Sequence, residues 1–520
     1  MAISVKRAVA GMSLINVGAM LGAAAQAIVV ARAFGTEHVY DLYLLIAVLP
    51  ELLTIFTQNL FAALLLPLFH KLQAEHDEAG AWRRMWNVFN VSLLFYAAAA
   101  AAIFLLARPI AGWLVADASA AELDYAASLL RVYAPAVALS LALRTFLSLH
   151  NAMESFVFPA LTNLVPPLFI VASVLLFAGT VGPFAIAMGA VCAAAAQVLI
   201  LTTRVITKGL RHWRPRLDVR APEVALFVGW AAPLAFGAAA EQLQTFIDRQ
   251  VAATLELPGA IAALKYGFVL TSFTIAFFSV PLARVTFTYF SRAAARAARG
   301  EINERFNLVL RQLAVFYVPA TVGLVILAEP LIRFLFVGGK FDEASLALAR
   351  PAVAAYAVGL LFLVATNLIR YVAYSYKRYL GYSLIAVGAV VATYAFDRGF
   401  AALWSYWGIA LARGAVALLW FVAVFAFLAR LERLTLEWRV AATAARALLA
   451  AAPMAALVWW LSRLEWGIGG PARLEPFVVA VASAAAGAAL YFALMFAMRE
   501  GEVVGLVRSL MEKIKGGGAR

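Results

Sequence analysis

Charged side chains inside long apolar segments are the residues of this chain best suited to chemistry. Glu241 and Asp248 are seven positions apart in an Ala-rich apolar segment, so a helix carries both on one face. Arg249 follows Asp248 directly, and Lys265 lies early in the next apolar segment, where it can approach either of them. Several charges at membrane depth need a watery cavity or one another. The cluster therefore predicts the lining of a polar cavity.

The N-terminal half carries a second set of candidates. Glu51 lies beside Pro50 in a very long apolar run, and a carboxylate inside a membrane-length helix is costly, which marks it as a functional candidate. We predict that Glu51 faces the Glu241–Lys265 cluster across a substrate cavity. The remaining candidates for lining this cavity are Gln26, Arg32, Asp41, Asn59, Arg144 and, further along the chain, Arg370.

Three of these residues also have structural explanations. Arg144 and Arg370 can extend toward the membrane surface or form structural ion pairs. Asp41 stands near the start of a predicted helix, where the helix dipole alone stabilises a carboxylate. The sequence leaves both explanations open for each residue.

Sequence signatures of enzymes are not found in the chain. It has no GxxxxGK[ST] loop and no HExxH motif, and its one cysteine, Cys192, excludes both an intramolecular disulfide and a cysteine metal cluster. We predict a transporter that uses no cofactor and no metal. Its uphill work would come from the membrane potential, a cation gradient or turnover of the substrate elsewhere.

The elements that position these residues are predicted to be membrane-spanning helices. Of the 520 residues, 65% are hydrophobic and 13% are charged, and the mean hydropathy is +0.89. The apolar runs reach about 20 residues, the length that crosses a bilayer. The sequence predicts an all-α polytopic membrane protein with about fourteen spans. They are residues 11–33, 42–69, 88–107, 129–150, 157–179, 182–206, 224–254, 260–290, 307–328, 344–374, 380–397, 401–429, 440–462 and 477–498.

The charges of the connecting segments predict the orientation in the membrane. Lys and Arg gather in the N-terminal segment, in most even-numbered connectors and in the C-terminal tail, whereas the odd-numbered connectors are mainly acidic. Since basic connectors remain in the cytoplasm, both termini are predicted to be cytoplasmic. This distribution explains the net charge of +14 without a nucleic-acid partner.

The chain is predicted to consist of two related halves. The expected parts are an N-terminal six-helix lobe (1–206), a basic linker (207–223), a C-terminal six-helix lobe (224–430), and two extra helices with a basic cytoplasmic tail (431–520). The linker mixes Arg with Leu, Trp and Val. It is either amphipathic and bound to the anionic inner leaflet, or simply a basic cytoplasmic loop.

Two pairs of segments indicate an internal repeat. Residues 31–75 and 252–299 share an acidic connector, a long helix with a proline near its inner end, and a basic loop. Residues 108–114 resemble residues 329–335, 221 positions later. An offset of six helices keeps the orientation of each span, so the predicted repeat is parallel, with its pseudo-twofold axis along the membrane normal.

With these features the chain resembles the MurJ/MviN family of the multidrug/oligosaccharidyl-lipid/polysaccharide exporter superfamily, over most of residues 10–430. The matching residues are Ala31–Gly35 followed by Asp41, Leu49-Pro50 with Leu52-Leu53, Pro67, Leu335–Phe341, Ala355–Leu360 and Tyr374-Ser375. The resemblance implies a two-lobed, fourteen-helix flippase of the bacterial inner membrane. Such a protein moves undecaprenyl-pyrophosphate-linked sugars, for example lipid II, to the outer leaflet by alternating access.

The chain departs from the pattern of typical lipid II flippases at three places. Charged pairs of the family are replaced by Gln26-Ala27, Thr54-Ile55 and Gly267-Phe268. Arginines at such positions would suit a pyrophosphate, which they bind bidentately. We predict that Arg249 and Lys265 supply replacement positive charge.

The departures leave the cargo open at this point. The first candidate is lipid II, and the second is an exopolysaccharide or O-antigen repeat unit. A different class is a small molecule exported together with a cation. A lipid-linked sugar and the bilayer are the expected partners, and the protein is expected to be a monomer.

Overall fold

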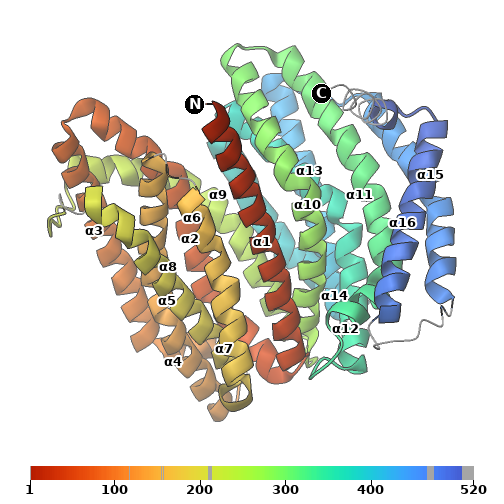
Figure 1. Cartoon of the computed structure of the whole chain (residues 1–520), viewed down its shortest axis with the longest axis horizontal. Helices are drawn as coiled ribbons and strands as arrows, with labels where there is room; N and C mark the ends of the chain where they lie inside the picture. The colour runs from red at the N-terminus through yellow and green to blue at the C-terminus, as the bar shows by residue number, and fades with distance from the viewer. Residues whose placement is uncertain are drawn as a thin grey trace. The chain divides into compact units, whose positions relative to one another are not determined.

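The apolar runs of the sequence form long helices in the computed structural model (Figure 1). The structure describes residues 2–115, 118–153, 155, 157–208, 213–464, 466 and 474–505. The helices before residue 255 are α1 (Ala2–Phe34), α2 (His38–Glu75), α3 (Glu78–Leu105), α4 (Ala107–Leu114), α5 (Ala120–Ala152), α6 (Val157–Leu161), α7 (Val165–Val181), α8 (Phe184–Lys208) and α9 (Pro222–Ala253). The later helices are α10 (Ala260–Ala295), α11 (Arg299–Leu335), α12 (Glu343–Val358), α13 (Leu360–Ser375), α14 (Tyr379–Glu432), α15 (Trp438–Arg463) and α16 (Leu474–Ala497).

The predicted all-α membrane architecture is confirmed. Within the described residues, ten helical stretches are long and apolar enough to cross a membrane, and the bent pair α12 and α13 makes an eleventh. Most of the predicted spans lie on one helix or on part of one. The spans 157–179 and 344–374 each cover two successive helices, and 88–107 runs from α3 to the start of α4. The fourteen predicted spans exceed these eleven by three. Two of the three lie on α9 and α10, whose described residues contain shorter apolar stretches, and the third arises because α14 carries two predicted spans.

The helices of the second unit are interrupted at two places. The backbone of α14 is non-helical at Trp404 and Ser405, and Ser405 has a φ of 55°. The break lies close to the predicted boundary between spans 380–397 and 401–429. At the bend between α12 and α13, a Cβ on Gly359 would lie 2.7 Å from the Cα of Gly414, so two glycines let the backbones approach closely.

The chain divides into two compact units, and the division differs from the predicted one. The first unit is Met1–Ala262 with Gly338–Phe341, and the second is Ala263–Val337 with Asp342–Arg520. We predicted the boundary in the linker at 207–223, which assigned α9 to the second lobe. Instead α9 packs along α2 and α3. Its side chains explain this, because Arg249 and Gln250 donate hydrogen bonds to the carbonyls of Leu44 and Leu114.

An asparagine on the third span of the first unit holds the chain that leads into α9. Asn87 on α3 is fully buried. Its Nδ2 donates to the carbonyl of Asp218 (3.1 Å), and its Oδ1 accepts from the N–H of Asp218 (2.9 Å). Nδ2 also lies 3.1 Å from a carboxylate oxygen of Glu223. The predicted basic linker therefore lies against α3 and forms no helix at residues 213–218.

The second unit contains the same type of contact, made by an asparagine on α11. Asn307, also fully buried, donates from Nδ2 to the carbonyl of Thr435 (2.9 Å) and accepts at Oδ1 from the N–H of Glu437 (2.8 Å). These contacts hold the chain that leads into α15. Asn87 directly precedes the third predicted span and Asn307 begins the ninth, so the contact recurs after six spans. This supports the internal repeat that the sequence indicates.

The last two helices pack on the second unit, as expected for an addition to its core. Figure 1 shows α15 and α16 side by side next to α11, and both helices contact α11. Their shared core includes Val315, Met454 and Val458. The hydroxyl of buried Tyr491 on α16 donates to the carbonyl of Val315 at 2.9 Å.

Candidate functional site

Glu51 and Arg249 form an ion pair inside the first unit. Nη2 of Arg249 donates to Oε2 of Glu51 at 3.1 Å, and Nη1 donates to the carbonyl of Leu44 at 2.6 Å. The Arg249 side chain is 10% exposed and that of Glu51 is 34% exposed. The pair is neutral as a whole. The guanidinium of Arg249 is almost fully enclosed by protein, whereas part of the Glu51 carboxylate is accessible to a polar ligand.

Helix α2 presents Glu51 at the point where its surroundings change. Residues 42–48 are buried, whereas residues 51–56 are all half-buried. Pro50 has no N–H to donate to the carbonyl of Ile46, which weakens the helix at this turn. The site therefore lies where a tightly packed end of α2 gives way to a more open stretch.

Three buried tyrosines line the packed end of α2. The hydroxyls of Tyr43 and Tyr133 are 3.0 Å apart, which joins α2 to α5. The ring of Tyr40 stacks on Tyr43 with centroids 5.8 Å apart. Because all three side chains are buried, they form a rigid wall that fixes the start of α2. These tyrosines were not among the predicted site residues, although Tyr40 and Tyr43 lie close to Asp41 in the sequence.

Asp41 stabilises another helix. Its side chain is buried, and its two oxygens accept hydrogen bonds from the N–H groups of Gly259 (2.6 Å) and Ala262 (2.7 Å) at the start of α10. A carboxylate is favourable there because the first N–H groups of a helix have no partner within the helix. The structural explanation is supported, but the stabilised helix is α10 and not α2, the helix to which Asp41 belongs.

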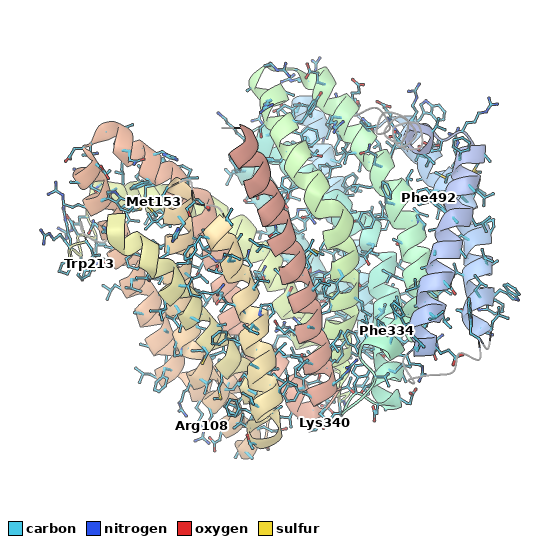
Figure 2. All side chains as sticks on the ribbon, in the orientation of Figure 1. Arg108, Met153, Trp213, Phe334, Lys340 and Phe492 are labelled. Atoms are coloured by element: carbon cyan, nitrogen blue, oxygen red, sulfur yellow. The ribbon has the colours of Figure 1, made fainter. Side chains whose placement is uncertain are left out.

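The hairpin Gly338–Phe341 lies against the end of α1. The N–H of Lys340 donates to the carbonyl of Arg32 at 2.8 Å, and its Nζ lies 3.0 Å from Glu37. Figure 2 labels Lys340 beside the end of α1. A Cβ on Gly35 would overlap the carbonyl oxygen of Lys340, and one on Gly339 would overlap that of Arg32. Both glycines have positive φ, 52° and 62° respectively.

This contact joins two stretches on which the family resemblance rests, Ala31–Gly35 and the end of Leu335–Phe341. Because the backbones touch where two glycines lack a side chain, each stretch constrains the other. In the sequence the two stretches are separate motifs, since no local pattern connects them across about three hundred residues.

The other predicted cavity residues of the first unit have different environments. Gln26 and Arg32 are half-buried on α1, and Asp248 is buried beside Arg249 on α9. Arg144 is half-buried on α5, and its Nε is buried without a hydrogen-bond partner in the described part of the chain. The side chains of Asn59 and Glu241 lie outside the described residues.

Two predicted residues belong to the second unit. Lys265 is half-buried on α10. Arg370 on α13 donates from Nη2 to Oδ1 of Asn367 at 2.7 Å, and its guanidinium lies 5.6 Å from the ring centre of Tyr371. Of the Glu241–Lys265 cluster that Glu51 is predicted to face, Arg249 contacts Glu51 directly within the first unit. A substrate cavity between Glu51 and the cluster stays a prediction. The approach of Lys265 to Asp248 or Arg249 stays a prediction.

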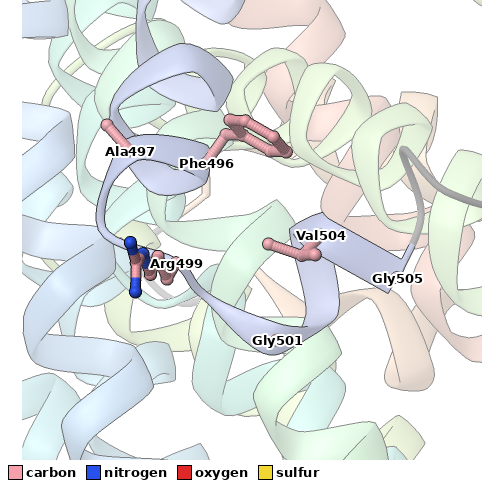
Figure 3. Close-up of a pocket in the computed structure, with 6 residues that line it drawn as sticks. All are labelled: Phe496, Ala497, Arg499, Gly501, Val504 and Gly505. Atoms are coloured by element: carbon pink, nitrogen blue, oxygen red, sulfur yellow. The ribbon is translucent and has the colours of Figure 1, made fainter.

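The remaining features of the described residues give no second site. Among these residues, no group of three or more His, Cys, Asp or Glu side chains is arranged to hold a metal ion. A pocket of about 600 Å³ lies at the turn after α16 and is lined by residues such as Phe496, Arg499 and Val504 (Figure 3). It contains none of the predicted site residues, and it borders the end of the described chain.

Comparison with known families gives one match along nearly the whole chain. The family model described as "Lipid II flippase MurJ" matches residues 30–497. The "Probable lipid II flippase MurJ" of Rhizobium meliloti is 27% identical over 349 residues, which are 64% of this chain and 63% of that protein. The aligned part thus spans somewhat less than two thirds of that relative's length.

Solved structures show the fold. A structure of "Lipid II flippase MurJ, inward closed conformation" aligns with a TM-score of 0.77 at 17% identity, covering 93% of this chain and 99% of the other. An inward-facing MATE family transporter of the MOP superfamily aligns with a TM-score of 0.60 at 13% identity, covering 83% and 95% respectively. The chain therefore has the fold of these solved structures.

Proposed function

The chain belongs to the lipid II flippase MurJ family, and we propose that it moves a lipid-linked sugar precursor from the inner to the outer leaflet of the bacterial inner membrane. The match over residues 30–497 carries this proposal. Lipid II is the proposed cargo, because it is the substrate in the family's name. Neither of the other candidates, a surface-glycan repeat unit or a small molecule exported with a cation, is favoured by the family match.

The physical task explains why charged groups stand inside long helices. A headgroup that carries sugars and a pyrophosphate cannot enter hydrocarbon unaided, since losing its hydration costs many kcal/mol. A transporter lowers this cost with polar groups at membrane depth. The half-exposed carboxylate of Glu51, paired with Arg249 inside the span His38–Thr57, is such a group.

The direct test is rescue of a bacterial strain depleted of its own lipid II flippase. The full chain is expressed from an inducible promoter, and growth and cell shape are followed during depletion. Sustained growth is expected. Lysis at an expression level that gives normal amounts of membrane-inserted protein contradicts lipid II as the cargo. Restored surface glycan in a strain lacking a repeat-unit flippase would then favour the second candidate.

We further propose that both termini are cytoplasmic, which rests on the charge distribution of the connectors. A variant with Cys192→Ser receives one cysteine, either Lys340→Cys or Arg216→Cys. A membrane-impermeant maleimide added to cells with a permeabilised outer membrane should label position 340 and not position 216. The reverse pattern contradicts the orientation.

Transport is proposed to be driven by the membrane potential or a cation gradient, and the protein to act as a monomer. The absence of a phosphate-binding loop from the sequence supports the first point. In vesicles containing the purified protein, dissipating the potential with valinomycin and potassium should slow translocation. Separate removal of sodium and of the pH gradient identifies the coupling ion, and rates unaffected by all three treatments contradict the proposal.

A further inference from the structure

The chain between α8 and α9 follows a fixed, non-helical path along α3. Asn90 on α3 is buried, and its Nδ2 donates hydrogen bonds to the carbonyls of Arg214 (2.8 Å) and Arg216 (3.1 Å). Asn87, one helical turn earlier, binds both the N–H and the carbonyl of Asp218. Two buried side chains therefore determine the path of this segment.

These contacts place the segment at the membrane boundary of α3. Asn90 lies in the first turn of the predicted span 88–107, and the basic pair Arg83-Arg84 precedes it by about two turns. One turn beyond Asn90, Leu94 and Phe95 are exposed, as side chains in contact with lipid tails are. The segment therefore touches α3 where the helix passes from a basic to an apolar surface, which is the level of the lipid headgroups.

The exposed side chains of the segment include three large apolar ones. Trp213, Leu217 and Val219 are 43%, 55% and 63% exposed. Trp213 donates its indole N–H to Oδ1 of Asn90 at 3.2 Å, and Figure 2 labels it beside α3. A tryptophan with a bonded N–H and an exposed ring is typical of the membrane interface. Three such side chains within seven residues form a patch, whereas a single exposed one would need no explanation.

The same segment carries excess positive charge. Residues 213–220 contain three arginines and one aspartate, which leaves a net charge of +2. Arg216 forms an ion pair with Asp218 at 2.7 Å. Arg214 and Arg220 are exposed, and within the described residues neither of them forms an ion pair. These two arginines are therefore available to an anionic surface.

An anionic lipid surface accommodates both the apolar patch and the arginines. Negative headgroups of the inner leaflet attract basic segments, and the boundary between headgroups and tails accepts apolar side chains. An acidic protein could bind the arginines as well. The level of the segment on α3 favours the lipid, because headgroups surround a membrane protein at that level.

We infer that residues 213–220 are an interfacial anchor that binds the inner leaflet of the bilayer. The three exposed apolar side chains enter the headgroup layer, and Arg214 and Arg220 bind the phosphates of anionic phospholipids. The inference rests on the proposed cytoplasmic side of the linker and not on the cargo. The amphipathic character of the anchor comes from the path that Asn87 and Asn90 fix, and not from a helix.

The test measures the depth of the interfacial anchor in lipid nanodiscs that contain the full-length protein. Leu217→Cys in a Cys192→Ser background carries a fluorophore, and phospholipids with a quencher at the top of the acyl chain report its contact with the lipid. The nanodiscs consist of phosphatidylcholine alone or of an equal mixture with phosphatidylglycerol. Ala74→Cys is the reference position, because Ala74 is exposed and lies beyond the predicted span 42–69.

We expect strong quenching at position 217, weak quenching at position 74, and an increase at position 217 when phosphatidylglycerol is present. Arg214→Gln/Arg220→Gln should lose most of this increase, because each arginine near the surface adds to the attraction. Arg214→Lys/Arg220→Lys should keep it, since the attraction depends on the charge. Trp213→Ser should lower the quenching in both lipid mixtures.

The matched control is Arg430→Gln/Arg439→Gln, which removes the same charge from two exposed arginines of the second unit on the same predicted side of the membrane. It should leave the quenching at position 217 unchanged. Melting temperatures establish that each variant is folded. A higher salt concentration should reduce only the increase that phosphatidylglycerol causes, since salt screens exposed charges.

Three results overturn the inference. The first is weak quenching at position 217 in both lipid mixtures, which leaves the segment in water. The second is quenching that changes neither with phosphatidylglycerol nor with the arginine variants, because no anionic headgroup is then bound. The third is crosslinking of two copies through position 217 without lipid quenching, which assigns the surface to a second copy of the chain. The nanodisc result does not depend on orientation, so a reversed labelling pattern in cells contradicts the inner leaflet and not the lipid contact.

Discussion

Arg249 donates a hydrogen bond to Glu51 at 3.1 Å, although the two residues are 198 positions apart in the chain. The contact fastens α9 to the middle of α2 and balances two charges at membrane depth. It explains why α9 belongs to the first compact unit, and it gives the candidate site its accessible carboxylate. The predictions below separate the structural and the transport roles of this site.

Replacing Arg249 should destabilise the protein more than replacing its partner Glu51. Arg249→Gln should lower the free energy of unfolding by about 2–4 kcal/mol, because it leaves the Glu51 carboxylate unpaired and removes the bond to Leu44. Glu51→Gln should cost less, since its carboxylate is 34% exposed. Thermal unfolding in detergent measures both. The exposed carboxylate of Glu256 provides the control, Glu256→Gln, and equal effects of all three variants contradict a specific pair.

Asp41 should matter for stability more than for cargo binding. Asp41→Ala removes the acceptors for Gly259 and Ala262 and should cost about 2–3 kcal/mol. Asp41→Asn should keep one acceptor and about half of this stability. Asp124→Asn is the control, because Asp124 and its partner Arg108 are 64% and 60% exposed. A stable Asp41→Asn protein that does not transport would instead support the cavity role.

The contact between Gly35 and the hairpin at Gly338–Phe341 should not tolerate a methyl group. Gly35→Ala and Gly339→Ala add a Cβ that overlaps a carbonyl oxygen in a backbone with positive φ. Each should lower the yield of folded protein and the melting temperature. Gly388→Ala is the matched control, because a Cβ there meets no atom within 4 Å and α14 gains helix propensity. Unchanged melting of Gly35→Ala would contradict the close approach.

The backbone contacts of Asn87 and Asn307 should contribute similar amounts to the free energy of unfolding. Asn87→Ala and Asn307→Ala each remove a buried side chain that donates to and accepts from the backbone, which should cost about 1–3 kcal/mol. Hydrogen exchange should rise at residues 213–221 in the first variant and at residues 433–437 in the second. Asn163→Ala, at an exposed position, serves as the control. Exchange that rises equally in both segments for either variant contradicts two separate contacts.

The N-terminal cap of α12 should make a small part of the stability depend on pH. The carboxylate of Asp342 accepts a hydrogen bond from the N–H of Ser345 (2.9 Å), which lowers the pKa of Asp342 below its usual value. A lowered folded-state pKa means that the stabilisation is present above the unfolded-state pKa, about 3.9, and is lost as the pH falls through the folded-state value. Asp342→Ala should cost about 1 kcal/mol at pH 7 and almost nothing at pH 2.

The control for this cap is Asp342→Asn, which keeps an acceptor and cannot titrate. Its melting temperature should depend less on pH than that of the wild type between pH 5 and pH 2. A wild-type protein and an Asn variant with identical pH profiles would show that the Asp342 carboxylate does not stabilise the folded state.

The sequence alone predicted the helices, because membrane spans are encoded by local runs of apolar residues long enough to cross a bilayer. Each predicted span is helical over most of its length, including the two spans on either side of the break at Trp404 and Ser405. The repeat was also visible, since it is a matter of order along the chain. Asn87 and Asn307 give this repeat a physical basis that the sequence comparison lacked.

Only the tertiary structure decided which polar groups meet. Asp41 caps the start of α10, Arg249 pairs with Glu51, and the Gly35 turn receives the hairpin at Lys340. Each partner lies about two hundred or more positions away, and no local pattern specifies it. The sequence determined where charge enters the membrane-length helices, because its cost there is a local property. The fold determined which of those charges are balanced, and Glu51 balances Arg249 within the first unit.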